Sequence, residues 1–292
     1  MQSILLPPPP SLSAYIDNYQ LVDIDWTSAQ APNNVWRLIP YGKVSMLFLY
    51  GDPYRYSLQG PNAPMQEERL AFLIGPLLQP VWMKFSGRSR LIKVQFSSSG
   101  AQRFLPVNME ELRTAPSLDL AAVWGNATYE LLEQLDEAAS DADRIDRLSR
   151  FLEKRLRPAP DRRDYVDYTI HRIQASKGNL SIKELEKQLG ISTRHLERLF
   201  QARIGISPKK LGKLLRLNQA FSSLLENPAL SLTDLSYEAG YYDQSHFCRD
   251  FKAVSGVSPT DFTAQRNVEL FVTHGACLLP QAHAVSQFPG NN

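Results

Sequence analysis

Hydrophobic and polar residues alternate along the first part of the chain in a pattern typical of β-strands. Between residues 35 and 97, short runs rich in β-branched and aromatic residues are separated by glycine and proline turns. Late in this stretch Lys93 separates Ile92 from Val94, as on a strand that buries one face. Several such strands at this spacing predict an antiparallel sandwich or barrel.

The period of the pattern changes after Asn126. Leucine and isoleucine then recur at helical spacing, and from residue 164 to about residue 263 no stretch reads convincingly as a strand. The prolines and charges of residues 157–164 mark the predicted boundary between the two parts. The pattern therefore predicts an α+β two-domain chain: a β-rich domain with C-terminal helices (1–160), an all-α domain (161–266) and a partly disordered tail (267–292).

The helical part contains an internal repeat. The stretch SIKELEKQLGISTRHLERLFQARIGISP (181–208) aligns with SLTDLSYEAGYYDQSHFCRDFKAVSGVSP (231–259). In each copy two short helices flank a turn glycine, and a Ser-Pro pair begins the next helix. Apolar residues between the copies predict one helix of about 18 residues, roughly 27 Å long. The repeat therefore predicts two helix–turn–helix units joined by a long helix.

The second helix of each copy carries a polar stripe opposite its apolar face. The stripe consists of Arg194, Arg198 and Gln201 in the first copy, and of Gln244, Ser245, Arg249 and Lys252 in the second. Arginine reads guanine, glutamine reads adenine, and lysine or arginine neutralises phosphate. On a single amphipathic helix such a stripe is more often a solvated face. The duplication, the turn glycines and the basic residues nearby together favour DNA binding.

Charge is distributed unevenly along the chain. The sequence holds 32 Lys and Arg against 30 Asp and Glu, a net charge of +2. Residues 183–216 hold nine basic and three acidic side chains, a local excess that favours a polyanionic partner. Lys209 and Lys210, in this block, are expected to contact phosphate. Residues 217–292 hold three basic and seven acidic side chains, so the second copy is expected to bind phosphate weakly.

The most diagnostic stretch of the second copy is AGYYDQSHFCRDFK (239–252), followed by GVSPTDF (256–262). On these residues, the chain from 165 to 263 resembles the DNA-binding domain of AraC/XylS-type bacterial transcription regulators. The resemblance implies that both second helices present their exposed positions to successive major-groove segments. By position, the implied base-reading residues are Arg194, His195, Glu197 and Arg198 in the first copy, and Gln244, Ser245, His246 and Arg249 in the second.

The N-terminal part resembles, more loosely, the β-rich sensor region of one subgroup of this family. The resemblance is carried by RLIPYGKVSMLFLYG (37–51) and LIKVQFSSSGAQRFLPVNMEEL (91–112). It implies a cupin-like barrel followed by helices that can pack against a partner subunit. Aromatic residues of the strands are candidates to line an effector pocket, although most strand aromatics are core; the candidates are Trp36, Tyr50 and Trp82. The stripe of Leu148, Leu152 and Leu156 either forms a homodimer or packs within the chain.

The placement of histidine and cysteine argues against a metal-dependent enzyme. All five histidines lie at residue 171 or beyond, which excludes a His-ligated site in the predicted barrel. The two cysteines, Cys248 and Cys277, cannot form a disulfide framework or a Cys-rich zinc site. Because no nucleophile or acid–base motif is present either, we expect no enzymatic activity, no metal and no cofactor.

The pattern also bears on location and function. No run approaches 18 apolar residues, and MQSILLPPPP lacks the basic start of a signal peptide, so we expect a cytoplasmic protein without membrane association. We expect a transcription regulator that binds double-stranded DNA and is controlled by a small-molecule effector in the N-terminal domain. Two alternatives stay open: a constitutive regulator whose N-terminal domain only dimerises or contacts RNA polymerase, and a barrel enzyme fused to a DNA reader.

Overall fold

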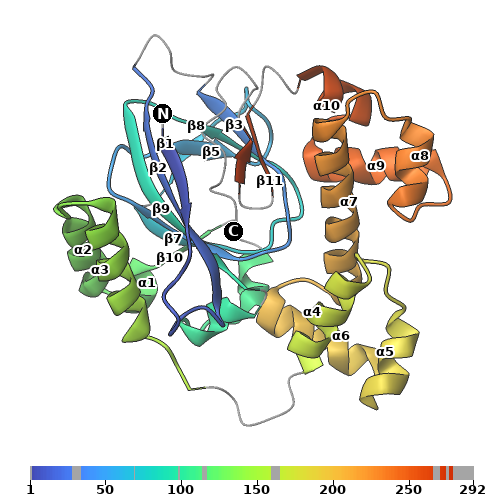
Figure 1. Ribbon diagram of the computed structural model, residues 1–292, viewed down its shortest axis with the longest axis horizontal. Coiled ribbons are helices and arrows are strands. Elements are labelled where there is room, and N and C mark those ends of the chain that lie inside the picture. The colour runs from blue at the N-terminus through green and yellow to red at the C-terminus, as the bar shows by residue number, and fades with distance from the viewer. Residues whose placement is uncertain are drawn as a thin grey trace, which may run out of the picture.

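The computed structural model describes residues 2–27, 34–68, 70–97, 99–113, 117–158, 165–265, 270–273 and 276–278. Two β-sheets occupy the N-terminal part, and the C-terminal part is helical (Figure 1). The first sheet is antiparallel and contains, in spatial order, β1 (Gln2–Leu6), β2 (Ile16–Asp25), β9 (Arg88–Phe96), β4 (Ser45–Leu49), β7 (Ala71–Ile74) and β10 (Ser117–Asp119).

The second sheet includes two strands from the predicted tail. Its spatial order is β12 (Ala276–Leu278), β11 (Leu270–Thr273), β3 (Val35–Leu38), β8 (Val81–Lys84), β5 (Arg55–Ser57) and β6 (Gln66–Glu67). β11 runs parallel to β3, and the other pairs are antiparallel. The sequence did not predict β11 and β12. Most of the segment expected to be disordered, 279–292, lies outside the described residues.

The described strands are not closed into the cupin-like barrel that the resemblance implies. Over the described residues the strands form two separate sheets, whose edges are β1 and β10 in one and β12 and β6 in the other. Inward-facing side chains of both sheets share one core, to which the first sheet contributes Leu47 and Phe72 and the second contributes Trp36 and Met83. Alternation along a strand marks a buried face in a sandwich and in a barrel alike. Closure depends on which edge strands pair, and alternation does not encode that pairing.

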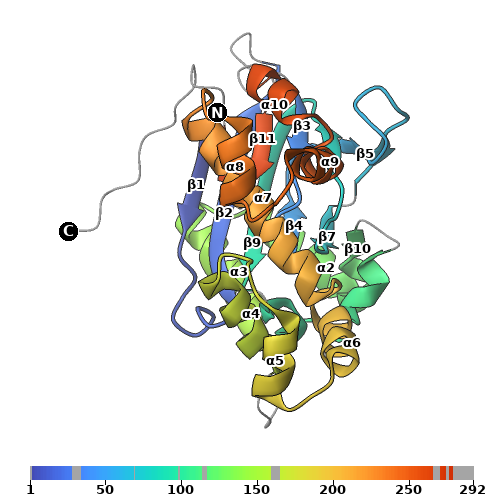
Figure 2. The same cartoon turned by 90° about the vertical axis from the view of Figure 1, so that its right-hand side faces the viewer.

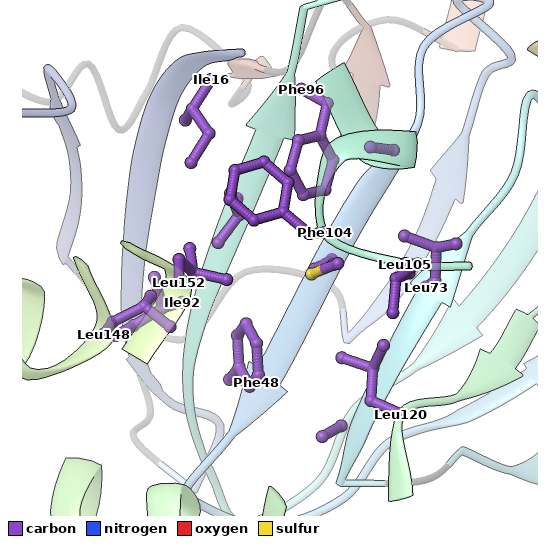
Figure 3. Close-up of a cluster of buried hydrophobic side chains, with 14 of the residues drawn as sticks. Ile16, Phe48, Leu73, Ile92, Phe96, Phe104, Leu105, Leu120, Leu148 and Leu152 are labelled. Atoms are coloured by element: carbon purple, nitrogen blue, oxygen red, sulfur yellow. The ribbon is translucent and has the colours of Figure 1, made fainter. Parts of the chain in front are cut away.

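Helices cover the other face of the first sheet. They are α1 (Ala121–Trp124), α2 (Asn126–Asp136) and α3 (Asp141–Glu153), together with the 3-10 segments η1 (Gly100–Arg103) and η2 (Met109–Arg113). Leu148 and Leu152 of α3 are completely buried and lie in the same cluster as Phe48 and Ile92 of the sheet (Figure 3). The leucine stripe therefore packs within the chain, and these two side chains are not available to a partner subunit.

The C-terminal part consists of seven helices over residues 165–265. They are α4 (Tyr165–Ala175), α5 (Ile182–Leu189), α6 (Thr193–Ile204), α7 (Pro208–Glu226), α8 (Leu232–Glu238), α9 (Gln244–Ser255) and α10 (Pro259–Gln265). α7 has 19 residues, so it is roughly 28 Å long. None of the described helices is long and apolar enough to cross a membrane.

The two parts of the chain contact each other along α7 and at the end of α9 (Figure 2). Asn218 Nδ2, on α7, donates to Pro40 O at 3.0 Å. Ile39, just before this proline, is completely buried in the core of the C-terminal helices. Arg37 Nη1 donates to Ser255 O, at the last residue of α9, at 3.4 Å. The segment that follows β3 is therefore held by the helical domain. Of the predicted boundary, residues 157–164, all but the first two residues lie outside the described residues.

Candidate DNA-binding surface

The helix pair α5 and α6 is fixed by side chains within its own sequence. Ser181 Oγ accepts from Glu184 N at the start of α5, and Ser192 Oγ accepts from His195 N at the start of α6. Gly190 ends α5 with a φ of +66°, the left-handed region that glycine adopts without strain. These contacts set the angle at which α6 leaves the turn. The predicted caps and turn glycine of this copy are confirmed.

The helix pair α8 and α9 repeats the arrangement with a different cap. Ser231 Oγ accepts from Asp234 N, and the carboxylate of Asp243 accepts from Ser245 N at 3.0 Å and His246 N at 3.2 Å. The bond from Ser245 N is the main reason why the pKa of Asp243 lies below its ordinary value. Because the folded pKa is lowered, the cap stabilises the helix at neutral pH, and its contribution is lost as the pH falls through that lowered value.

Both copies end in the same way. Gly205 follows α6 and Gly256 follows α9, each with a φ of +85°. Ser207 then caps α7 by accepting from Lys210 N, and Ser258 Oγ accepts from Asp261 N at the start of α10. The predicted Ser-Pro helix starts are therefore confirmed. The two copies place α6 and α9 beside opposite ends of α7 (Figures 1 and 2).

The structure places the predicted base-reading side chains at the surface of these two helices. On α6, Arg194, Glu197 and Arg198 are exposed, whereas His195 and Gln201 are half-buried. On α9, exposed side chains occupy every predicted position: Gln244, Ser245, His246, Arg249 and Lys252. The predicted phosphate contacts, Lys209 and Lys210, are exposed in the first turn of α7. Whether these residues contact DNA stays a prediction.

Several of these side chains have protein partners. Arg198 Nη2 lies 3.2 Å from His195 Nδ1, and Thr233 Oγ1 donates to Gln244 Oε1 at 3.1 Å. His246 Nε2 lies 3.5 Å from Asp250 Oδ2. The contacts within each copy hold polar side chains in place on the exposed face, which lowers the entropy lost when such a side chain binds a partner.

Sequence reasoning missed a charge network between α7 and α9. Lys213 Nζ contacts Asp250 Oδ1 at 2.5 Å, and Tyr241 OH donates to Asp250 Oδ2 at 3.0 Å. Burial, followed by the nearby Asp250 charge, raises the pKa of Tyr241, so its hydroxyl stays protonated at neutral pH. The pattern of apolar positions gave no signal for this network because its members come from three different segments. It ties the second helix pair to α7.

The same junction forms a groove that contains cations from the connecting helix α7 and from α9 of the second copy. Its lining includes Lys209 at the start of α7 and Arg249 on α9, and its volume is about 600 Å³. Lys213 and Arg216 also line it, although Lys213 is paired with Asp250. The second copy is therefore more basic in space than the count along residues 217–292 indicates.

The predicted effector residues lie in three different places. Trp36 lines a cavity between the two sheets. Tyr50 lies under the guanidinium groups of Arg90 and Arg144, at 5.3 and 4.8 Å from its ring centre. The Trp82 ring packs where α9 ends, 3.1 Å from the position that a Cβ atom on Gly256 would occupy, which is closer than an ordinary van der Waals contact. The effector role of all three stays a prediction, and the structure brings only Trp36 to the cavity.

No group of three or more His, Cys, Asp or Glu side chains in the described part of the chain is arranged to hold a metal ion. Cys248, on α9, is half-buried, and desolvation raises the pKa of its thiol. Of the two cysteines, Cys277 lies in β12, where only the backbone is described.

Each part of the chain matches a known protein family over part of its length. Residues 185–265 match a family described as a helix-turn-helix domain, and residues 5–116 match a domain of unknown function, DUF6597. The Msm operon regulatory protein of Streptococcus mutans is 30% identical over 99 residues, which are 34% of this chain and 35% of that protein. The transcriptional activator RhaS of Escherichia coli is 32% identical over 81 residues, 28% of this chain and 29% of that protein.

The C-terminal domain of this chain is an AraC/XylS-type helix-turn-helix domain. The chain spans about a third of the length of these curated relatives. Among solved structures, ToxT from Vibrio cholerae aligns over 84% of this chain and 98% of its own, with a TM-score of 0.46 and 14% identity. ToxT has also been solved with an unsaturated fatty acid bound.

Proposed function

We propose that this protein is a sequence-specific transcription regulator that reads DNA with two helix–turn–helix units. In this proposal α6 and α9 are the recognition helices, and α7 sets the distance between them. One observation supports this proposal most directly. The pairs α5–α6 and α8–α9 have matching caps and turns, and each presents exposed polar and basic side chains beside an opposite end of α7. The family of the C-terminal domain supports the same conclusion.

The proposal predicts the size of the DNA site. A helix of roughly 28 Å suits two readers in major-groove segments one turn, about 34 Å, apart on one face of the duplex. We therefore expect one chain to protect an asymmetric site of about 20 base pairs, with bending of the DNA where the two readers require it. The measurement is a footprint of the purified full-length protein on the DNA next to its own gene, with the stoichiometry determined in parallel.

A footprint that covers a single half-site per chain would contradict this arrangement. The matched control is a chain with Gln244→Ala and Arg249→Ala, which removes two exposed side chains of α9 and leaves α6 unchanged. We expect this control to keep protection over one half of the site and to lose it over the other. Uniform loss over both halves would show that the two helices do not act as separate readers.

We also propose that a small molecule bound to the N-terminal domain controls DNA binding. The observation in favour is a cavity between the sheets whose wall includes Pro40, the residue whose carbonyl is bonded to Asn218 of α7. A constitutive regulator is the second candidate. In that case the contact between Pro40 and Asn218 holds the two domains together and has no regulatory role. Affinity for the DNA site that does not change with any ligand would favour this second candidate. Homodimerisation and contact with RNA polymerase stay predictions.

A further inference from the structure

A cavity of about 70 Å³ lies between the two sheets. One water molecule needs about 10–15 Å³, so the space exceeds that of a single water several times. Most of its wall is apolar and comes from both sheets, with Leu47 and Leu91 on the first and Met83 on the second. Trp36 and Phe85 also line it, in an edge-to-face contact with ring centres 5.0 Å apart. Binding sites for small organic molecules combine such an apolar wall with a few placed polar groups.

One polar group at this cavity is an ammonium for which the described part of the chain provides no counter-ion. Lys93, on β9, is only 8% exposed, and its Nζ atom is buried with no hydrogen-bond partner among the described residues. The Nζ atom lies 4.9 Å from the centre of the Tyr41 ring, which gives the charge a cation–π contact. Burial removes the hydration of an ammonium, and a ring face replaces only part of it. A negatively charged partner would complete the environment of Lys93.

The described residues of the cavity wall offer no such partner. The described residues that line it include neither Asp nor Glu. Lys43, the other cation on the wall, differs from Lys93 because it is more exposed and contacts Asp17 at 2.5 Å. An anionic partner for Lys93 at this wall would therefore come from outside the described residues.

The neighbouring polar side chains are already bonded to one another. Tyr41 OH donates to Gln95 Oε1 at 2.8 Å, and Ser45 Oγ lies 3.2 Å from the same oxygen. The amide nitrogen of Gln95 donates to Val44 O at 3.0 Å. These groups therefore satisfy each other. Among the described lining residues, the Lys93 ammonium and the Trp36 indole N–H are buried donors without a hydrogen-bond partner, and only Lys93 is a cation.

We propose that this cavity binds an organic monocarboxylate with an apolar body. The carboxylate pairs with Lys93 Nζ, and the body lies between the sheets against Trp36 and Phe85. A charge-assisted hydrogen bond to a carboxylate is stronger than a neutral one and fixes the orientation of the ligand. The binding site stands on the cavity and Lys93 of this chain; only its effect on DNA rests on the proposed function.

The position of the site connects it to α7. Residues 39–42 contact both domains. Pro40 and Tyr41 line the cavity of the N-terminal domain, whereas Ile39 is buried in the core of the helical domain. A side chain on Gly42 would meet Leu211 and Leu214 of α7, so the backbone there approaches the helix closely. A carboxylate bound to Lys93 Nζ competes with the contact between Lys93 and the Tyr41 ring. Loss of that contact would shift Tyr41 and therefore residues 39–42. We therefore expect the ligand to change affinity for DNA.

The test measures ligand affinity of the full-length protein by calorimetry and tryptophan fluorescence. The probes are two sets with the same carbon skeleton: phenylacetate, phenethyl alcohol and phenethylamine, and octanoate, octanol and octylamine. We expect at least one carboxylate to bind about tenfold or more tightly than its alcohol, with the amine weakest because it repels Lys93. Lys93→Met is expected to remove this preference, and Lys93→Arg to retain part of it.

Lys43→Met is the matched control, because it removes a cation from the same wall that already has a carboxylate partner. We expect this variant to keep the preference for the carboxylate. The proposal is overturned if neither carboxylate binds at millimolar concentration, or if the preference survives in Lys93→Met. A loss of preference in Lys43→Met as large as in Lys93→Met would also overturn it. Failure of the proposed function has a different signature: the ligand-free protein shows no sequence-specific DNA binding.

Discussion

Phe251→Ala is expected to lower the free energy of unfolding by about 3–5 kcal/mol, because it empties the aromatic core between α7 and α9. The Phe251 ring is completely buried, and its centre lies 4.4 Å from that of Phe221 on α7. Phe247 and Phe262 complete the cluster at 5.6 and 5.5 Å. The cost is a large part of the total stability of an ordinary domain, about 5–15 kcal/mol. Thermal or urea unfolding of the full-length protein measures it.

Phe251→Ala is also expected to lower the temperature at which DNA binding is lost, because Phe251 holds α9 on α7. We expect this temperature to coincide with the melting temperature of the variant. Tyr242→Ala is the matched control in the same helix pair: its side chain is 100% exposed, so we expect a change within about 0.5 kcal/mol. Equal melting temperatures for Phe251→Ala and the wild type would show that α9 is not held by this cluster. A large loss for Tyr242→Ala would show that the exposed tyrosine packs against something in solution.

The features that sequence predicted well are those decided within a few residues. Ser181, Ser192 and Ser231 each cap a helix through the N–H three positions further on, as the spacing of side chain and backbone requires. Gly190 takes the left-handed conformation expected after the short helix α5. A cap or a turn involves only local geometry, so neither depends on the rest of the fold.

Lys93 shows where local pattern is insufficient. Its alternation with Ile92 and Val94 predicts that it faces away from the buried side, and it does point to the opposite face from them. That face is also buried, because the second sheet covers it while α2 and α3 cover the face of Ile92. Alternation reports that the two faces of a strand differ. It carries no information about which distant segment covers each face.

Arg249 shows the same limit for charge. Counted along the chain, the second copy has few basic residues, which predicts weak phosphate binding. In the folded protein Lys209 belongs to the same groove as Arg249, although 40 positions separate them in the sequence. The basic first turn of α7, which follows the first copy, lies beside α9 of the second copy. The electrostatic field that DNA meets is set by this folded arrangement.

Arg198→Ala is expected to weaken binding to the protein's own DNA site by about 5- to 150-fold, which corresponds to about 1–3 kcal/mol. Arg198 is exposed on α6, and its guanidinium lies 3.2 Å from the His195 ring, so its position on the proposed reading face is partly fixed. A base contact discriminates between sequences, so we expect affinity for random DNA to fall much less. Lys210→Ala is expected to behave differently, because a phosphate contact carries no sequence information.

For Lys210→Ala we expect similar weakening on specific and random DNA, and a salt dependence whose logarithmic slope decreases by about one. Arg55→Ala is the matched control: it removes an exposed arginine from β5 of the N-terminal domain, so it should change neither the preference nor the slope. The measurement is affinity at several salt concentrations for specific and random DNA with each variant. If Arg198→Ala lowers affinity for both DNAs equally, Arg198 contacts phosphate, and α6 reads the bases through other side chains.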